Sequence, residues 1–342
     1  MKTQVCCRCL TENKTGYGNF NRCLTLAKQL KRKKIDIIFL IDKNKKIINK
    51  LKASSFSYCL IPDKYSKINE HQFILKFLNQ KNLHSIIIDM RQFGEKLSKI
   101  LHENDKRVIL IDDVWSKNIY SDIFFNSTNV VNLDKYKIKN KSCQIYSGLK
   151  YYPINKNFLK YRKRFTDITD KDILTLVISM GGSDPNNLTY NLLKIIKDFN
   201  QIKINVILGP LYKNFKNLKS MIKNSDNVCL IQTPKNIFKE LSKGDVAITN
   251  GGNTLFEIIA LRIPSIVIPS FKHEVFYAKN FSKNKCIINL GFQQKNKKVV
   301  YNALNKIIKN TKVRKDLHRS TSNLIDGNGL ERMSKIISYF LQ

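Results

Sequence analysis

Short apolar runs that recur along nearly the whole chain are the feature that most restricts its fold. In the first part of the sequence they are IDIIFLID (35–42), HSIIIDM (84–90) and RVILIDD (107–113). Strands of a parallel sheet with helices on both faces have this near-continuous apolar composition. Stretches with apolar residues three and four positions apart, typical of amphipathic helices, lie between the runs. The alternation predicts consecutive βαβ units.

A second series of apolar runs follows an aromatic and basic stretch near the middle of the chain. These runs are LTLVISM (174–180), KINVILG (203–209), NVCLIQ (227–232), DVAITN (245–250), PSIVIP (264–269) and KCIINL (285–290). At 342 residues the chain is longer than one hydrophobic core usually supports. We therefore expect an α/β protein with two tandem doubly wound, Rossmann-like domains, residues 1–150 and 173–342, and a linker at 151–172. Ligands of such sheets bind beyond the carboxyl ends of the strands, so we expect the loops of both domains to face one cleft.

The chain is strongly basic, with 61 Lys and Arg against 26 Asp and Glu and a formal net charge of +35. The lysines are scattered among asparagines and isoleucines, and no Arg-rich tract is present. A compositional bias explains this better than a nucleic-acid surface, so no nucleic-acid partner is expected. The charge would still attract phosphorylated substrates and suit peripheral contact with an anionic membrane. The sequence leaves the oligomeric state open.

The eight cysteines lie mostly in apolar runs and are expected to be buried, reduced thiols. Cys6 and Cys9 form a CxxC pair, but no second pair with zinc spacing follows, and the five histidines are dispersed. We therefore expect no metal and no other cofactor. The sequence starts without the pattern of a signal peptide, and no apolar run approaches the roughly 18 residues of a membrane span. The expected location is the cytoplasm.

Two glycine-containing turns after expected strands are candidate ligand loops. In TGYGNFNRC (15–23), Gly16 and Gly18 would let the backbone approach a ligand, and the next helix offers N–H groups. A tight structural turn is the alternative. The second turn, SMGGSDPNN (179–187), is interpreted as a loop that faces a diphosphate, with an ordinary helix N-cap as the alternative. Its candidate binding residues are Gly181, Gly182, Ser183 and Asp184.

The most specific motif is ITNGGNTLFEIIALRIPSIVIPS (248–270). It opens a helix whose N-terminus can hold phosphate, and Glu257 follows in the first turn. A carboxylate there is badly placed for the anion but well placed to accept hydrogen bonds from ribose hydroxyls. The alternative is that Glu257 complements the helix dipole. The candidate phosphate-binding residues are Gly251, Gly252, Asn253 and Thr254.

Further titratable side chains follow other expected strands. After the run at 264–269 the sequence places a lysine, a histidine and a glutamate, which are Lys272, His273 and Glu274. In the first domain, Asp89 and the pair Asp112 and Asp113 end strands and could be helix caps, substrate ligands or both. For His273 a satisfied surface histidine is the alternative.

In this order and spacing the motifs resemble one family over nearly the full chain. It comprises the UDP-2,4-diacetamido-2,4,6-trideoxy-altropyranose hydrolases of pseudaminic acid biosynthesis and related spore-coat polysaccharide proteins that are predicted glycosyltransferases. Wider kin are the GT-B glycosyltransferases, including the UDP-GlcNAc transferase of peptidoglycan synthesis. The matching segments are GYGNFNRCLTLA (16–27), IDD (111–113), GLKYYPINKNF (148–158), MGGSD (180–184), GGNTLFE (251–257) and DGNG (326–329).

The resemblance implies a GT-B fold without a metal, in which the second domain holds most of UDP and the first-domain turn faces the sugar. By carry-over, Glu257 would bind the ribose, residues 251–254 the diphosphate, and the glycines of TGYG the sugar or phosphate. The chain departs from the hydrolases where they read GxGHxxR with a proposed catalytic His, because it has Asn19 there and keeps Arg22.

Two further departures concern the same implied site. Where the hydrolases have Arg followed two residues on by Asp, this chain has Arg8 and then Leu10. Where they have Asn-Gln-Glu, this chain has the 272–274 triplet, Lys-His-Glu. An amide cannot act as a general base at neutral pH, and loss of a positioned base typically costs about 10²- to 10⁴-fold in rate.

Three hypotheses about function follow. The first is hydrolysis of a UDP-activated acetamido sugar to free sugar and UDP, with His273, Glu274 or Asp89 in place of the missing imidazole. The second is transfer of the sugar to a carbohydrate or lipid-linked hydroxyl, which the loss of a hydrolytic His would suit. The third is a protein that binds a UDP-sugar without turnover.

Overall fold

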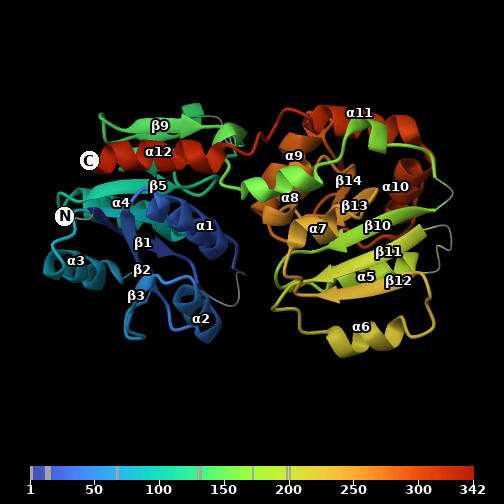
Figure 1. The fold of residues 1–342 in the computed structure, drawn as a ribbon, viewed down its shortest axis with the longest axis horizontal. Helices are drawn as coiled ribbons and strands as arrows, with labels where there is room; N and C mark the ends of the chain where they lie inside the picture. The colour runs from blue at the N-terminus through green and yellow to red at the C-terminus, as the bar shows by residue number, and fades with distance from the viewer. Residues whose placement is uncertain are drawn as a thin grey trace. The chain divides into compact units, whose positions relative to one another are not determined.

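The structure is a computed structural model that describes residues 3–11, 17–66, 69–128, 130, 133–171, 173–197, 199 and 202–342. The chain divides into two compact units (Figure 1). Unit 1 comprises Met1–Asn155 and Gly327–Gln342, and unit 2 comprises Lys156–Asp326. This division differs from the expected one at the C-terminal end, because the last helix belongs to unit 1.

Unit 1 is built on a parallel seven-stranded sheet with the strand order β3-β2-β1-β4-β5-β7-β9. Its strands are β1 (Thr3–Cys9), β2 (Ile35–Ile41), β3 (Ser57–Leu60), β4 (Ser85–Asp89), β5 (Arg107–Ile111), β7 (Ile123–Asn126) and β9 (Gln144–Ser147). Its α-helices are α1 (Gly18–Arg32), α2 (Lys45–Ala53), α3 (His71–Gln80), α4 (Gly94–His102) and α12 (Gly329–Leu341). A separate pair joins β6 (Asn118–Ile119) to β8 (Lys137–Ile138). The short 3₁₀ turns are η2 (Arg91–Phe93), η3 (Leu133–Lys135) and η4 (Leu149–Tyr151).

The last helix, α12, packs against α1 within unit 1, and Figure 1 shows the red C-terminal helix close to blue α1. Met333 and Ile337 are its fully buried apolar residues. At its start, a Cβ on Gly329 would clash with the carbonyl oxygen of Tyr152, so only glycine allows this approach. Burial of this apolar face explains why the helix joins unit 1.

Unit 2 contains a parallel six-stranded sheet with the order β12-β11-β10-β13-β14-β15. Its strands are β10 (Leu174–Ser179), β11 (Ile202–Leu208), β12 (Val228–Gln232), β13 (Val246–Thr249), β14 (Ser265–Val267) and β15 (Ile288–Asn289). Its helices are α5 (Leu188–Ile196), α6 (Phe215–Met221), α7 (Ile237–Leu241), α8 (Asn253–Leu261), α9 (Glu274–Lys283), α10 (Lys297–Lys309) and α11 (Thr311–Thr321). The 3₁₀ turns η5 (Lys156–Tyr161) and η6 (Phe165–Asp167) precede the sheet.

In each unit the order of the strands reverses beside the first strand. The reversal falls between β1 and β4 in unit 1 and between β10 and β13 in unit 2. The loops that leave these paired strands diverge to opposite faces of the sheet, which opens a crevice at the carboxyl ends. The predicted doubly wound α/β architecture is confirmed, and each unit has one switch point at which ligands of such folds bind.

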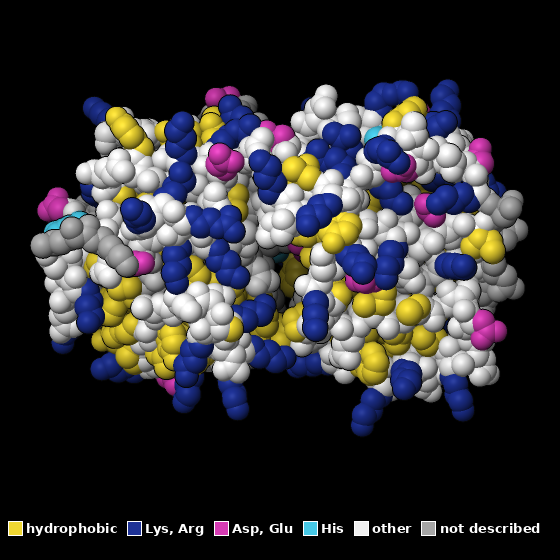
Figure 2. Space-filling model, in the orientation of Figure 1, with side chains coloured by type: hydrophobic (Ala, Val, Ile, Leu, Met, Phe, Trp, Pro, Cys, Tyr) yellow, Lys and Arg dark blue, Asp and Glu magenta, His cyan; other side chains and the backbone are white. Residues whose placement is uncertain are grey.

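The described residues contain no helix that is both long and apolar enough to cross a bilayer. Figure 2 shows Lys and Arg side chains spread widely over the visible face rather than gathered in one patch. That distribution agrees with the compositional explanation of the charge.

Candidate functional site

The switch point of unit 2 brings together the two glycine pairs singled out in the sequence. Residues Ser179 and Thr249 end β10 and β13 as register partners, and the Thr249 hydroxyl donates to the Ser179 carbonyl oxygen at 2.8 Å. The next residues therefore lie side by side. Gly181 has a φ of +77°, and a Cβ there would lie 3.1 Å from Asn250 Nδ2. Both conditions favour glycine.

The second glycine pair packs directly on Glu274, the first residue of α9. A Cβ on Gly251 would lie 2.6 Å from Glu274 Cβ, and one on Gly252 would lie 2.9 Å from Glu274 Oε1. Any side chain at Gly251 would push the turn away from α9. The glycines are thus required by packing between the turn after β13 and the start of α9.

The Glu274 carboxylate joins the turns that follow β13 and β14. Its Oε2 accepts from the backbone N–H groups of Ser270 at 2.7 Å, Phe271 at 3.2 Å and Gly251 at 3.3 Å. Its Oε1 accepts from Asn250 Nδ2 at 2.8 Å, and the residue is 2% exposed. Four hydrogen bonds therefore occupy the carboxylate. Glu274 as a replacement base stays a prediction, and in the structure its carboxylate joins the two turns.

Asn250 carries a buried acceptor with no protein donor. Its Nδ2 donates to Glu274 Oε1 at 2.8 Å, and both amide atoms lie close to Gly181. Within the described part of the chain, Asn250 Oδ1 has no hydrogen-bond partner, although the residue is 6% exposed. Buried acceptors are rarely left unpaired. The sequence shows this residue immediately before the glycine pair, but its importance is visible only in the structure.

Helix α8 begins at Asn253, at the mouth of the unit 2 switch point. Its N-cap residue is Gly252, which has no side chain to accept from the N–H groups of the first turn. Asn253 and Thr254 occupy this first turn, the former exposed and the latter half-buried. An uncapped helix N-terminus with its positive dipole end is suited to an anion.

Glu257 is the fifth residue of α8 and so lies just beyond the first turn, in which it was expected. Its carboxyl group is half-buried, and burial raises its pKa to about 7. Among residues that the structure describes, nothing forms a hydrogen bond or ion pair with it. An unpaired, desolvated carboxylate beside an uncapped helix N-terminus is typical of a binding site rather than of a structural contact.

The turn after β10 divides into a structural part and an open part. Asp184 is buried, and its carboxylate accepts from the backbone N–H groups of Leu188 at 2.9 Å and Thr189 at 2.8 Å. It therefore caps α5, as in the alternative interpretation of this motif. By contrast, Gly182 is exposed and Ser183 half-buried, and a Cβ on Gly182 would meet nothing within 4 Å. Gly182 therefore has open space beside it on this turn.

The remaining unit 2 candidates lie in the turn between β14 and α9. Lys272 is exposed and His273 half-buried. The imidazole is stacked on Phe271, with ring centroids 5.7 Å apart, and its edge meets Tyr277 at 6.3 Å. The geometry places His273 beside the turn that Glu274 holds to the residues after β13.

The switch point of unit 1 contains a buried ion-pair network around Arg22 of α1. Its Nε and Nη2 donate to the two oxygens of Asp89 at 2.8 and 2.7 Å, and its Nη1 donates to Asp113 Oδ2 at 2.8 Å. Asp89 ends β4 and is 1% exposed. Burial opposes the charge on Arg22, yet the two carboxylates outweigh it and raise its pKa. The network fixes α1 to the ends of β4 and β5.

Asn19, at the position of the hydrolase His, joins this network through both amide atoms. Its Nδ2 donates to Asp89 Oδ1 at 2.5 Å, and its Oδ1 accepts from Arg91 Nε at 3.2 Å. Arg91 follows β4 and has a φ of +52°, a strained conformation for a residue with a Cβ. Sequence reasoning missed Arg91, because a positive φ at a non-glycine residue leaves no signal in the pattern.

The neighbouring acids have separate roles. Asp112 accepts from the backbone N–H groups of Val114, Trp115 and Ser116, so it caps the turn after β5. Burial raises its pKa to about 6. Asp113 points to Arg22 through Oδ2, whereas its Oδ1 is buried without a partner in the described residues. The pair thus includes one cap and one member of the network.

Arg8 has different surroundings from those expected of a substrate ligand. Its side chain is fully buried, and it donates to both oxygens of Glu70 at 2.8 Å and to Asp42 Oδ1 at 3.2 Å. Burial opposes its charge, but the carboxylates of Glu70 and Asp42 outweigh burial and raise its pKa. Arg8 therefore ties β1 to the turns that precede α2 and α3. Of the TGYG glycines, Gly18 starts α1, and Gly16 lies outside the described residues.

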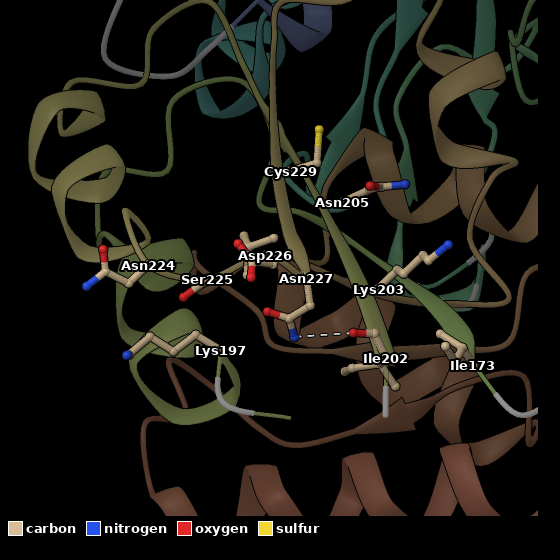
Figure 3. A pocket seen from close by; sticks show the side chains of 11 residues that line it. Ile173, Lys197, Ile202, Lys203, Asn205, Asn224, Ser225, Asp226, Asn227 and Cys229 are labelled. Atoms are coloured by element: carbon tan, nitrogen blue, oxygen red, sulfur yellow. Dashed lines mark hydrogen bonds between the residues drawn. The ribbon is translucent and has the colours of Figure 1, made fainter. Parts of the chain in front are cut away.

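A polar pocket of about 530 Å³ lies at the opposite edge of the unit 2 sheet (Figure 3). Ile173, Ile202 and Val228 line it, at or next to the amino ends of β10, β11 and β12. Asn227 Nδ2 donates to the Ile202 carbonyl oxygen at 3.3 Å across it. Because ligands of doubly wound sheets bind at carboxyl ends, this pocket is separate from the switch-point site.

Two doubly wound parallel sheets in one chain define the GT-B class of fold, and comparison with solved structures agrees. MurG of Acinetobacter baumannii superposes with a TM-score of 0.71 at 13% identity, covering 98% of this chain and 99% of that one. The spinosyn rhamnosyltransferase SpnG, complexed with thymidine diphosphate, gives a TM-score of 0.70 at 9% identity. The superposition covers 99% of this chain and 100% of SpnG. At these identities the likeness is one of fold.

Sequence comparison adds relatives, among them the following three, whereas no protein-family model matches. An uncharacterized protein of Methanocaldococcus jannaschii is 30% identical over 74% of this chain and 53% of its own length. The spore coat polysaccharide biosynthesis protein SpsG of Bacillus subtilis is 24% identical over 79% of this chain and 81% of its own length. A third relative, from Helicobacter pylori, is 24% identical over 97% of this chain and 54% of its own length. It is named pseudaminic acid cytidylyltransferase and UDP-2,4-diacetamido-2,4,6-trideoxy-β-L-altropyranose hydrolase. The chain thus spans about half the length of the first and third and matches no family model.

Proposed function

We propose that this protein is a GT-B enzyme of surface-glycan biosynthesis that transfers an acetamido sugar from UDP to a hydroxyl of a carbohydrate or lipid-linked acceptor. One observation carries the proposal: at the unit 2 switch point, the uncapped start of α8 lies one turn from the unpaired carboxyl group of Glu257. A nucleoside diphosphate has the complementary pair of groups. Its diphosphate suits the helix N-terminus, and its ribose hydroxyls suit the carboxylate.

The surrounding turns support binding of the diphosphate without a metal ion. Gly181 and Gly251 allow the turns after β10 and β13 to approach closely, and Glu274 holds the second turn to α9. Asn250 Oδ1 is left to accept a hydrogen bond from a ligand hydroxyl or amide. In transfer, the bond between the anomeric carbon and the phosphate oxygen breaks, UDP leaves with the electron pair, and the acceptor oxygen bonds to carbon and loses its proton.

We favour a hydroxyl acceptor over water because most of the side chains expected to replace the hydrolase His as a base are not available to take a proton. Asn19 cannot take a proton at neutral pH. Asp89 is 1% exposed and paired through both oxygens with Arg22, and Glu274 accepts four hydrogen bonds. His273 is the remaining candidate for the base that takes the proton of the attacking hydroxyl.

Hydrolysis is the second candidate function, and one specific observation favours it. The Helicobacter pylori relative aligned over 97% of this chain has a hydrolase of a UDP-diacetamido-trideoxy sugar in its name. Such a reaction would use the same nucleotide site with water as the acceptor. It belongs to the synthesis of pseudaminic-acid-type sugars.

The two candidates differ in what releases UDP. We would incubate the protein with UDP-GlcNAc and with the UDP-diacetamido-trideoxy sugar, each with and without carbohydrate and lipid-linked acceptors, and measure UDP. Release that requires an acceptor supports transfer, and release in buffer alone supports hydrolysis. Binding of a UDP-sugar without release under any of these conditions contradicts both.

The pKa of Glu257 predicts how binding depends on pH. The ionised carboxylate is the stronger acceptor for ribose hydroxyls, and with a pKa of about 7 its ionised fraction rises from about 10% at pH 6 to about 90% at pH 8. We therefore expect the affinity for UDP-GlcNAc to rise by up to roughly tenfold over this range. Both phosphates of a UDP-sugar are diesters and keep their charge, so the ligand does not titrate. Calorimetry would check this, and an equally steep profile for Glu257→Gln would contradict it.

Asn19→His tests whether the amide suppresses attack by water. The substitution restores an imidazole at the position of the hydrolase His, next to Asp89. A positioned base typically contributes about 10²- to 10⁴-fold, so we expect UDP release without acceptor to rise by at least about tenfold. Asn21→His, at an exposed position of the same helix, is the control and should leave release unchanged. Equal UDP release from the two variants would show that the residue at position 19 does not control attack by water.

A further inference from the structure

Three buried thiols converge in unit 1, on one face of its sheet. Cys7 and Cys9 lie two residues apart on β1, so their side chains share a face, and Cys23 comes from α1, which packs on the sheet. The three Sγ atoms all lie within 4.8 Å of one another, and the residues are 2%, 0% and 1% exposed. Two consecutive elements thus bring three potential soft ligands to one point.

A carboxylate oxygen adjoins the thiols. Asp89 Oδ2 lies 3.5 Å from Cys23 Sγ, and Asp89 is the register partner of Cys9 on the neighbouring strand. The same oxygen accepts from Arg22 Nε at 2.8 Å. Asp89 thus adjoins one member of the thiol cluster, Cys23, and links the cluster to the ion-pair network.

The distances are close to those that a tetrahedral ion requires. A zinc–sulfur bond of about 2.3 Å corresponds to sulfur atoms about 3.8 Å apart. With all three Sγ atoms within 4.8 Å, each pair has to approach by at most about 1 Å, a shift that small side-chain rotations supply. A divalent ion reduces the charge of three thiolates to −1, whereas a monovalent ion would leave −2 in a buried site, where uncompensated charge is costly. The arrangement thus favours a divalent thiophilic ion.

We propose that Cys7, Cys9 and Cys23 bind one divalent thiophilic cation of the zinc type. The sequence concealed this site because its CxxC pair, Cys6 and Cys9, lies on opposite faces of the sheet, with Cys6 in the apolar cluster of the other face. This inference is independent of the proposed nucleotide site.

The test uses the full-length protein, treated with a chelator and kept reduced with a phosphine. Cd²⁺ is the probe, because cadmium thiolates have a strong ultraviolet charge-transfer band and follow the chemistry of Zn²⁺. We expect the band to saturate at one Cd²⁺ per chain and to be lost when excess Zn²⁺ is added. Absence of a band, or a band that does not saturate at one ion, overturns the proposal.

Single substitutions identify the ligands. Cys7→Ser, Cys9→Ser and Cys23→Ser should each abolish or sharply weaken the band, whereas Cys6→Ser should keep it. Cys6 is the matched control because it lies on the same strand and is equally buried, but faces the other way. Circular dichroism identifies any variant that fails to fold, and Cys→Ala at the same position then replaces it. Retention of the band in folded variants of all three cysteines contradicts the assignment, as does its loss in Cys6→Ser.

Discussion

Glu257→Ala is expected to lower the affinity for UDP-GlcNAc by roughly 10- to 150-fold while leaving the ligand-free protein at least as stable as the wild type. Hydrogen bonds to a charged group contribute about 1.5–3 kcal/mol, which corresponds to that change in affinity. The stability of the free protein should not fall, because the carboxylate has no partner among the described residues and burial raises its pKa. Few substitutions of a half-buried residue combine these two effects.

Two measurements on the same samples separate them. Calorimetry gives the affinity, and thermal unfolding with and without UDP-GlcNAc gives the stability and the shift caused by the ligand. Glu103→Ala is the control, because Glu103 is an exposed glutamate of unit 1 whose ion pair with Lys99 is exposed. Wild-type affinity in the Glu257→Ala protein would show that the nucleotide does not contact Glu257. One that loses affinity only because it unfolds would show a lower melting temperature without ligand.

Arg22→Ala has the second large expected effect, on the free energy of unfolding. The substitution leaves Asp89 and Asp113, 1% and 6% exposed, without their shared counter-charge. Removal of one partner from a buried ion pair typically costs about 3–5 kcal/mol, because an uncompensated charge stays buried. Urea unfolding would measure the loss.

The design of this experiment includes a control and a rescue. Arg319→Ala removes an exposed ion pair with Asp316 and should cost less than about 1 kcal/mol. Adding Asp113→Asn to Arg22→Ala removes one of the stranded charges and should restore part of the stability. An Arg22→Ala protein as stable as the Arg319→Ala protein would mean that the network contributes little to folding.

The sheets could be predicted from the sequence because their central strands are buried on both faces. β4, β5, β10, β11, β13 and β14 coincide closely with apolar runs, and the reversal of strand order follows from the doubly wound class. Edge strands carry weaker patterns: β3 (SYCL) has no buried residue and was not anticipated. The C-terminal helix was assigned to the second domain, which precedes it directly in the sequence. Periodicity identifies an amphipathic helix but not the surface that covers its apolar face.

The candidate site was predictable in position but less so in the roles of its acids. Glycine pairs at strand ends located the switch-point turns, and Glu257 followed from its spacing within α8. The carboxylates of Glu274 and Asp184 look like free ligands in the sequence, yet backbone N–H groups occupy them. Whether an acid meets a ligand or an N–H group depends on how distant turns pack, and one sequence does not record this. Arg91 was missed because its positive φ leaves no signal in the sequence, and the thiol cluster because its cysteines lie on two different elements.

The return of α12 to unit 1 makes the connectivity of this chain that of a domain insertion. Unit 2 is one continuous segment, Lys156–Asp326, placed within the sequence of unit 1. A fragment that stops before Gly327 would lack the helix that covers α1 and would leave apolar surface exposed. Unit 2 could be exchanged as a cassette between related chains, whereas unit 1 has to be carried as two pieces that bracket it.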